Sequence, residues 1–393
     1  MKLSKFKKSN LFTPARVLVM GFAALIIFGT LLLLLPAASQ NNESAGWIDA
    51  LFTATSAVCV TGLVVLDTGT HWTVFGKTVI GFLIQVGGLG IMTMATLFAV
   101  ILGKQISLKE RLILQQAVGK DSPAGVVRFC LYMLGLTVLL EMIGALLLSF
   151  RFIPNYGVIK GIGFAMFHAV SAFCNAGFDL MGDGRSLTLY VNDPLVTMTV
   201  GILIVLGGLG FPVMLDVLNH YRLLRFSLHT RLVLLTTVFM LSFGTLGYLV
   251  LEWHNPTTLG ELGFFSKIMA GFFQSLTTRT AGFSTIDTGG LSTASQLLTV
   301  LFMFIGGSPA STAGGIKTAT AGILVFMALS VIQGKEHVEI FERRIPYDIV
   351  NRAITILVIA IAMVVSITMV MTLLEPDYSF MAILFEVTSA FGT

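Results

Sequence analysis

The sequence has little charge and few of the patterns that build soluble enzymes. Only 11% of its 393 residues are charged, whereas 55% are hydrophobic. An ordinary soluble domain carries roughly a quarter charged residues. The three cysteines show no paired spacing, no cluster of His, Cys or Glu has metal-ligand spacing, and no glycine-rich phosphate loop joins a strand to a helix. The low charge excludes an ordinary soluble domain. The missing motifs leave no support for a disulfide framework, a zinc site or ATP hydrolysis.

Long hydrophobic runs are what the chain has instead. They lie at about 17–35, 74–102, 127–150, 194–219, 231–251, 296–333 and 352–374. About 20 apolar residues in a helix cross a bilayer, so the runs predict an all-α polytopic membrane protein. The first run follows Lys2, Lys5, Lys7 and Lys8 and also fits a secretory signal peptide. Because many similar runs follow it, we interpret it as an uncleaved first span.

The distribution of charge predicts the orientation in the membrane. Lys and Arg gather in the N-terminal tail 1–16 and at 104–128, 222–231 and 335–352, whereas Asp and Glu dominate the segments between. Basic loops stay in the cytoplasm, so we expect a cytoplasmic N-terminus and outward-opening segments between the basic ones. The net charge of +4 then reflects orientation and gives no support to nucleic-acid binding.

Four similar polar-tolerant stretches interrupt the apolar sequence. In three of them a Phe and a Gly stand ten residues apart, and the fourth ends early; the stretches are 52–62, 167–177, 272–282 and 385–393. Each follows an apolar segment too short to span, at about 47–58, 161–173, 264–278 or 380–390. A second motif recurs in step with them, at Gln85–Gly90, Val205–Gly210 and, in part, Phe304–Pro309.

These two motifs predict four pseudo-symmetric repeats around one central pore. Each repeat would consist of a span (M1), a short re-entrant helix (P) and a second span (M2). The repeats would occupy 17–104, 127–221, 231–334 and 350–393, the last without its M2. Irregular backbone persists at membrane depth only where protein buries it or it lines a wet cavity.

A ring of backbone carbonyls from such loops suits a monovalent cation. Carbonyl oxygens can replace the hydration shell of a potassium ion. The loops offer no carboxylate ring of the kind that a divalent ion would need; the nearest carboxylate is Asp179, two residues beyond Gly177. The short helices would also direct their partially negative C-termini toward the cation.

The chain resembles the Trk/Ktr/HKT superfamily of potassium transporters, in which one chain carries four units similar to a potassium-channel subunit. Aligned on the family's filter glycine, the ion-binding positions implied here are Val60, Thr61, Gly62, Asn175, Ala176, Gly177, Thr280, Ala281, Gly282 and Thr393. The resemblance implies that K⁺ is the transported ion and the only metal, held at this filter. Because the sequence stops before a fourth glycine, we expect that it does not close a conducting pore alone.

Within the superfamily the chain is most similar to the bacterial Ktr membrane subunits (KtrB-like), since it begins almost directly with its first repeat. The resemblance implies a homodimer in the bacterial plasma (inner) membrane. It also implies a cytoplasmic ring of KtrA-like proteins whose RCK domains bind ATP or ADP, with no nucleotide bound by this chain itself.

The ion preference follows from one position. Sodium-favouring relatives often carry serine at the first filter glycine, so Gly62 implies potassium. Na⁺ as an activator or coupling ion stays open, as does a Na⁺-permeable or Na⁺/K⁺ transporter of the same family. A secondary solute transporter with inverted repeats is a more distant alternative, because the repeats here share one charge orientation. An enzyme is not expected, since no nucleophile–base pair is apparent.

Segment 296–333 is longer than one span and is broken in its middle. The break predicts either a kinked helix or, as the resemblance implies, an intramembrane gating loop. The gate residues would be Gly306, Gly307, Ser308, Pro309, Ala310, Ser311, Thr312, Ala313, Gly314 and Gly315, followed by Lys317. Small and polar residues of this kind cannot hold a stable lipid-facing helix.

Two cations inside the membrane need partners. We expect Arg279 to point behind the filter and brace it, with Glu386 or Glu141 as its partner. Lys317 would pair near the gate, with Asp216 as a candidate. His168 lacks a second ligand at suitable spacing, so we interpret it as a packing or hydrogen-bonding residue. The cysteines Cys59, Cys130 and Cys174 are interpreted as small apolar fillers.

Overall fold

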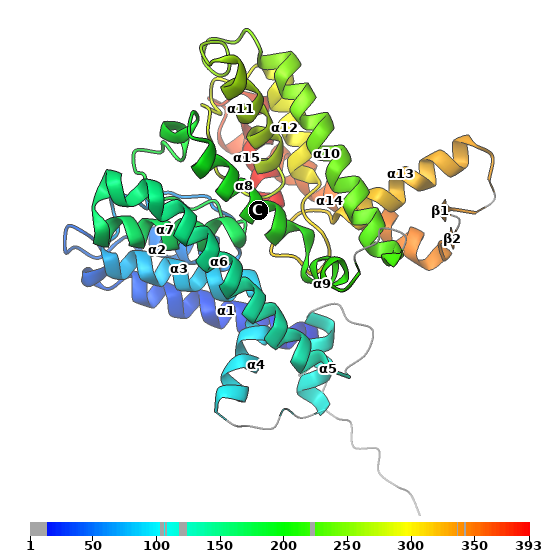
Figure 1. The fold of residues 1–393 in the computed structure, drawn as a ribbon, viewed down its shortest axis with the longest axis horizontal. Coiled ribbons are helices and arrows are strands. Elements are labelled where there is room, and N and C mark those ends of the chain that lie inside the picture. Colours follow the sequence, from blue (N-terminus) through cyan, green and yellow to red (C-terminus); the bar gives the residue numbers. More distant parts are fainter. Residues whose placement is uncertain are drawn as a thin grey trace, which may run out of the picture.

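Helices make up nearly all of the secondary structure in the computed structural model. It describes residues 14–102, 106, 108–117, 124–220, 225–335, 337–341 and 343–393. The predicted tail up to residue 13 and the predicted repeat ends at 104 and 221 lie outside these residues. The helices radiate from a centre near which the chain ends at Thr393 (Figure 1).

The first group of helices contains a short helix packed between longer ones. α1 packs on α2 and α3, and Thr73 caps α3 by accepting a hydrogen bond from the Gly76 N–H. The group comprises α1 (Pro14–Leu33), the 3-10 turn η2 (Pro36–Ala38), α2 (Trp47–Val58), α3 (Val74–Leu89), α4 (Ile91–Ile101) and α5 (Leu108–Ala117).

The second group repeats this order. α7 folds back along α6 at Gly157, whose φ of +81° is a conformation that side chains rarely adopt. The Asp193 carboxylate caps α8, which begins with Pro194. The group comprises α6 (Val126–Tyr156), α7 (Val158–Phe173), the 3-10 turn η3 (Thr188–Tyr190), α8 (Pro194–Leu209) and α9 (Phe211–Asn219).

The remaining helices form a third group and part of a fourth. α11 packs on α10, and α15 packs on α12 and α14. A two-residue antiparallel hairpin lies between α13 and α14. The elements are α10 (Leu228–Glu252), α11 (Phe264–Thr277), α12 (Thr293–Phe304), α13 (Thr318–Ile332), β1 (Glu339–Ile340), β2 (Arg343–Arg344), α14 (Tyr347–Leu374) and α15 (Phe380–Gly392).

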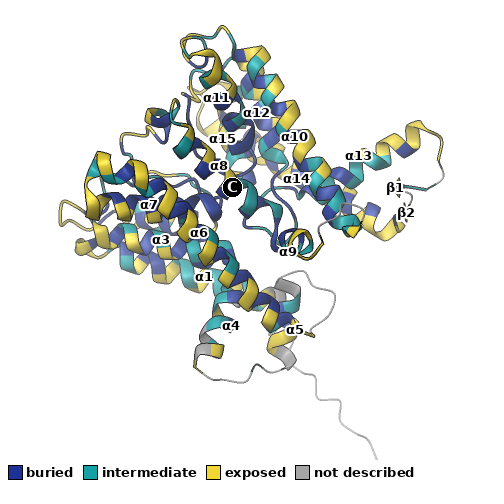
Figure 2. Cartoon of the chain, in the orientation of Figure 1, coloured by how far each residue is buried: buried dark blue, intermediate teal, exposed yellow. Residues whose placement is uncertain are grey.

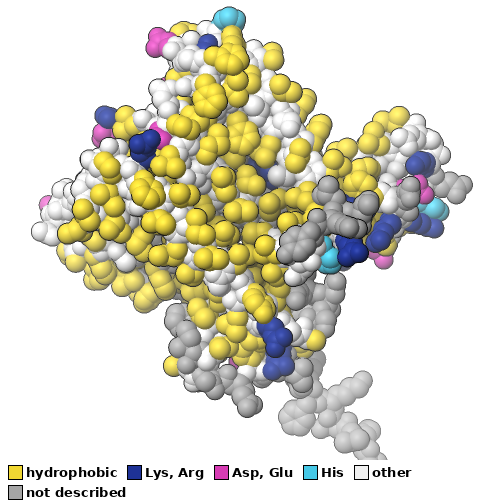
Figure 3. Space-filling model, viewed as in Figure 1, with side chains coloured by type: hydrophobic (Ala, Val, Ile, Leu, Met, Phe, Trp, Pro, Cys, Tyr) yellow, Lys and Arg dark blue, Asp and Glu magenta, His cyan; other side chains and the backbone are white. Residues whose placement is uncertain are grey.

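Four helices of the described chain are long and apolar enough to cross a membrane. They are α1 (from Arg16), α6, α10 and α14, and a fifth span results if the bent pair α8 and α9 is counted as one. Their outer faces are exposed, whereas buried residues concentrate toward the centre (Figure 2). Hydrophobic side chains cover most of the visible face, and charged ones lie mainly toward its edges (Figure 3). Exposed apolar surface of this kind suits a lipid environment.

The structure differs from prediction in the segments 74–102 and 194–219, which were expected to be continuous spans. α3 and α4 are separate helices divided at Gly90, with φ +83°, and α8 and α9 are divided at Gly210, with φ +85°. The axes of α8 and α9 differ by 97°. A break inside the second long segment is therefore common to the first three groups and is not confined to 296–333.

Candidate functional site

The three complete loops share one unusual backbone shape. Two residues before each loop glycine stands a residue with positive φ, and Thr393 has the same conformation in the fourth stretch. The values are Val60 57°, Asn175 56°, Thr280 68° and Thr393 61°, with Gly62 at 78°, Gly177 at 71° and Gly282 at 78°. A β-branched residue such as Val or Thr rarely adopts positive φ, so this conformation stores strain that the surrounding structure must hold.

The loop glycines pack against one another. A β-carbon built on Gly177 would lie 2.8 Å from the Gly282 Cα, and one built on Gly282 would lie 2.9 Å from the Gly177 Cα. A β-carbon on Gly62 would collide with the carbonyl oxygen of Ala176. Three loops that are far apart in the sequence thus meet backbone to backbone, and only glycine permits this approach.

In the three loops, backbone N–H groups form hydrogen bonds, whereas the backbone carbonyl groups accept none from the described residues. The amides of Thr61, Ala176 and Ala281 donate back to their short helices, at 2.8 Å, 2.7 Å and 3.0 Å. Among the described residues, no hydrogen bond ends on the carbonyl oxygen of any residue in 60–62, 175–177 or 280–282. Buried carbonyls without a partner are rare in proteins. Six of these nine residues are buried, Thr61 and Gly62 are half-buried, and Gly282 is exposed. The nine oxygens lie on three touching loops and form a set of oxygen ligands suited to a cation.

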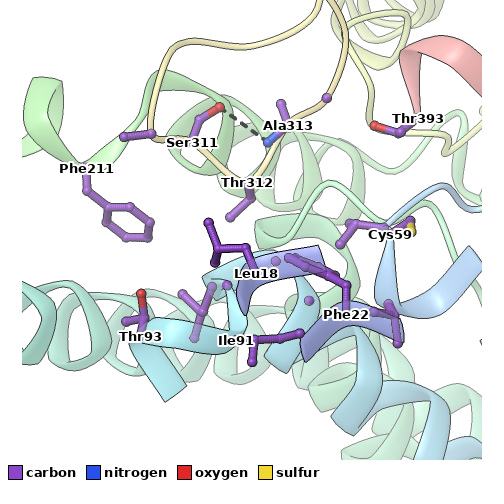
Figure 4. A pocket seen from close by; sticks show the side chains of 18 of the residues that line it. Leu18, Phe22, Cys59, Ile91, Thr93, Phe211, Ser311, Thr312, Ala313 and Thr393 are labelled. Carbon is purple, nitrogen blue, oxygen red and sulfur yellow. Dashed lines mark hydrogen bonds between the residues drawn. The ribbon is translucent and has the colours of Figure 1, made fainter. Parts of the chain in front are cut away.

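A cavity of about 330 Å³ lies at the inner end of these loops. Its lining includes Cys59 and Val60 of the first loop, Thr393, and residues 310–314 of the segment that breaks 296–333. Figure 4 shows Ser311 and Thr312 on one side of this cavity, with Leu18 and Phe22 of α1 on the other. The predicted filter and the predicted gate therefore border the same space.

Segment 306–315 is an irregular loop between α12 and α13, held against the break between α8 and α9. The Ser308 and Thr312 N–H groups donate to the carbonyls of Gly208 and Gly207, at 2.9 Å and 3.3 Å. The Phe211 N–H donates to the Ala310 carbonyl at 3.2 Å. The segment is thus an ordered loop rather than a kinked helix, and its position depends on the break between α8 and α9, which was not predicted from the sequence. The pattern Gly210-Phe-Pro212 was the signal for that break.

One hydroxyl joins this loop directly to a short helix. Thr312 Oγ1 donates to the carbonyl oxygen of Phe173, the last residue of α7, at 3.1 Å. Thr312 is buried, so the bond is shielded from water. The loop therefore lies next to the second predicted filter loop, which begins two residues after Phe173.

Lys317 does not pair with Asp216 in the structure. Its Nζ donates to the Ala313 carbonyl at 2.6 Å and so closes the end of the same loop. Asp216 instead accepts from the Ser227 N–H at 2.9 Å and contacts His220 Nδ1 at 3.0 Å. A backbone carbonyl inside the loop thus takes the place of the expected carboxylate.

Arg279 lies behind the third loop, but with a different partner from those expected. Its side chain is buried, and Nη2 donates to Thr237 Oγ1 on α10 at 3.4 Å. Glu141 accepts from Gln85 instead, at 3.1 Å. Glu386 lines a second cavity, of about 240 Å³, between the third loop and α15, and no ion pair within the described chain joins it to Arg279.

His168 is a hydrogen-bonding core residue, as predicted. Its Nδ1 lies 2.7 Å from the Phe164 carbonyl, and its Nε2 accepts from the Leu180 N–H at 3.4 Å. These bonds require a neutral ring with the proton on Nδ1. Cys130 and Cys174 are buried, whereas Cys59 is exposed and lines the inner cavity, which differs from its predicted role as filler.

Asp179, at the outer end of the second loop, is the carboxylate closest to a filter glycine in the sequence. Burial raises the pKa of Asp179 to about 6, and the nearby Asp67 charge adds to the rise although the Met181 N–H opposes it. The pKa of Asp67 is lowered, since hydrogen bonds from Gly184 and Thr70 outweigh its own burial. The pKa of Asp179 is thus raised and that of the neighbouring Asp67 is lowered, so the two carboxylates differ in the pH at which they become charged.

Comparison with known proteins agrees with this geometry. The family model for TrkH, described as a cation transport protein, matches residues 3–393. The Ktr system potassium uptake protein B of Bacillus subtilis is 44% identical over 97% of this chain and 85% of its own length. The potassium/sodium uptake protein NtpJ of Enterococcus hirae is 42% identical over all of this chain and 87% of its own length. The crystal structure of the potassium transporter TrkH from Vibrio parahaemolyticus shares the fold, with a TM-score of 0.74 at 15% identity, covering 98% of this chain and 78% of that one.

Proposed function

Since this chain belongs to the TrkH family of cation transport proteins, we propose that it takes up potassium across the bacterial plasma membrane. It would act as the ion-translocating subunit of a Ktr-type system. The observation that carries the proposal is the set of nine unbonded carbonyl oxygens on three loops that meet at their glycines. In a membrane, carbonyls in this position need a partner, and a dehydrated K⁺ provides it. Membership of a transporter family also confirms the prediction that the chain is not an enzyme.

The proposed architecture is four M1–P–M2 repeats around one pore. It is supported by the recurrence of a long helix followed by a short helix, and by the positive φ that Val60, Asn175, Thr280 and Thr393 share. Thr393 would contribute the first position of the fourth filter strand. The filter would open outward and the basic segments would face the cytoplasm, by the positive-inside rule.

The proposed gate is the loop 306–315 with Lys317. It borders the inner cavity and contacts the second filter loop through the Thr312–Phe173 hydrogen bond. In this position the loop obstructs the route from the filter to the cytoplasm, and transport requires it to move. Because most of its residues are small and only a few hydrogen bonds join it to the rest of the protein, moving the loop requires little free energy.

Potassium is proposed over sodium as the main ion because all three complete loops carry glycine at the key position. The similarity to a protein named for both potassium and sodium uptake supports a second candidate, a transporter that also admits Na⁺. In this second candidate function, Na⁺ would also act as an activator or coupling ion.

The proposed partners follow from the relatives, which are named as proteins of Ktr systems. We expect a homodimer of this chain on a cytoplasmic RCK ring that binds ATP or ADP. In this arrangement the ring controls the gate from below, and this chain binds no nucleotide.

Two measurements test the function. The full-length protein should restore growth of bacteria that lack potassium uptake at low K⁺, and purified protein in liposomes should carry K⁺. Folded protein that moves neither K⁺ nor Na⁺ would overturn the proposal.

The native thiols provide an independent test of the pore's position. Cys59 lines the inner cavity, whereas Cys130 and Cys174 are buried. A membrane-impermeant, positively charged thiol reagent applied from the cytoplasmic side should block transport. The Cys59→Ser variant should resist the block, and equal sensitivity in that variant would contradict the assignment of the cavity to the pore.

A further inference from the structure

One hydroxyl-bearing residue in each of two short helices holds its filter glycine from both sides. Ser171 accepts the Ala176 N–H with its carbonyl oxygen at 2.7 Å and donates its Oγ to the Phe178 carbonyl at 2.7 Å. Ala176 and Phe178 are the residues immediately before and after Gly177. A single residue thus holds the backbone on both sides of the glycine, through the N–H of the residue before it and the carbonyl of the residue after it.

Thr277 does the same in the third repeat. Its carbonyl oxygen accepts the Ala281 N–H at 3.0 Å, and its Oγ1 donates to the Phe283 carbonyl. Thr277 stands five residues before its glycine and Ser171 stands six before, so neither residue type nor spacing is the same. Two different local sequences thus form the same two hydrogen bonds around the loop glycine. This agreement indicates that the two bonds are important for the shape of the loop.

The first loop has only half of this arrangement. Ser56 stands six residues before Gly62, as Ser171 does before Gly177, and its carbonyl accepts the Thr61 N–H at 2.8 Å. Its buried Oγ, however, has no hydrogen-bond partner among the residues that the structure describes. The following residue, Leu63, therefore has no bond from a helix hydroxyl to its carbonyl.

The side chains after the glycines show the same asymmetry. Phe178 and Phe283 are each 1% exposed, and the Phe283 ring packs against His168 of the neighbouring repeat. Leu63, which holds the same position after Gly62, is only half-buried, and the next two residues, Val64 and Val65, are 48% and 58% exposed. The second and third loops are thus anchored by a carbonyl and a buried ring, and the first loop is anchored by neither.

We propose that Ser171 and Thr277 are specificity-determining positioning residues, here called the bracket residues, for the proposed potassium filter. The inference rests on the proposed function. A carbonyl ring selects K⁺ only if it does not contract around the smaller Na⁺. Because each bracket residue holds the neighbours of its glycine on both sides, it prevents that contraction in two of the loops. The first loop, without a bracket, is left as the adjustable part of the ring.

The test compares isosteric variants of the full-length protein in liposomes under K⁺/Na⁺ gradients. Ser171→Ala and Thr277→Val should each lower the K⁺/Na⁺ permeability ratio by about fivefold, the effect that corresponds to one lost buried hydrogen bond. Thr277→Ser keeps a hydroxyl and should restore the ratio. Ser56→Ala removes an equivalent hydroxyl that has no partner and should leave the ratio unchanged.

The outcomes separate this inference from the proposed function. A parent protein that carries no K⁺ would refute the function itself. A parent that carries K⁺, with bracket variants that keep its ratio, would overturn the bracket alone. The bracket inference is also overturned if Ser56→Ala lowers the K⁺/Na⁺ permeability ratio as much as Ser171→Ala and Thr277→Val do. It is overturned as well if both bracket variants fail to fold while Ser56→Ala folds normally.

Discussion

At the scale of single residues, the filter glycines matter for contact between loops as much as for backbone shape. Gly62 combines a φ of +78° with an approach that places any β-carbon on the Ala176 carbonyl. Gly157 has a similar φ of +81° but open space around it. The two positions therefore separate the effect of backbone strain from the effect of collision.

We predict that Gly62→Ser raises sodium permeation. The added side chain must displace the second loop, which carries one of the bracketed glycines. The K⁺/Na⁺ permeability ratio in liposomes should fall by about tenfold or more, as expected for a change above ~1.4 kcal/mol. Gly157→Ser should strain its own turn and leave the ratio intact. Equal ratios in Gly62→Ser and the parent would contradict the filter assignment.

A second prediction concerns external pH. Because the pKa of Asp179 is raised to about 6, this carboxyl is neutral at pH 5 and charged at pH 7. A negative charge at the outer end concentrates cations there, so uptake from low K⁺ should increase as external pH rises from 5 to 7. Asp179→Asn should flatten this part of the pH profile. Asp67→Asn should not flatten it, since the lowered pKa of Asp67 keeps that group charged throughout.

At the scale of elements, the broken helices determine where the gate lies. The loop 306–315 accepts and donates backbone hydrogen bonds at the α8–α9 break, and Thr312 bonds it to the short helix α7. The proposed gate is thus held by two neighbouring groups of helices. A movement of α9 changes the carbonyl positions on which the loop depends.

This arrangement predicts the effect of removing one hydroxyl. Thr312→Val keeps the shape of the side chain but loses the bond to Phe173, which should favour the open gate by about fivefold. Potassium flux through liposomes without any cytoplasmic partner should increase accordingly. Thr312→Ser retains the hydroxyl and should behave like the parent. Unchanged flux in Thr312→Val would show that this bond does not restrain the gate.

The sequence predicted most helices and the loop positions, because both depend on local patterns. The predicted short segment 47–58 matches α2, and the loops lie at the predicted glycines. The break at Gly90 was not predicted, since glycines are common in continuous membrane helices, and Gly87 and Gly88 do lie within α3. The partners of Arg279 and Lys317 were also missed. They are a hydroxyl and a carbonyl chosen by tertiary packing, whereas charge complementarity suggested carboxylates.

At the scale of the whole molecule, the loops form a site only when the groups of helices are together. Ions that bind the folded protein stabilise it by mass action. We predict that K⁺ raises the thermal unfolding temperature of the full-length protein in detergent. At 100 times its Kd, K⁺ should add roughly 2.7 kcal/mol of stability. Na⁺ at the same ionic strength is the control, and an equal rise with Na⁺ would favour the second candidate function.

The contact between Gly177 and Gly282 also has a consequence for biogenesis. Each of these loops is shaped by the backbone of the other, so neither can reach its final form while the ribosome has delivered only the first two groups of helices. The proposed filter would therefore mature late, after the helices that flank it have inserted. Until the third group of helices is in place, the contact that shapes the second loop is missing, so a half-made chain holds no finished ion site.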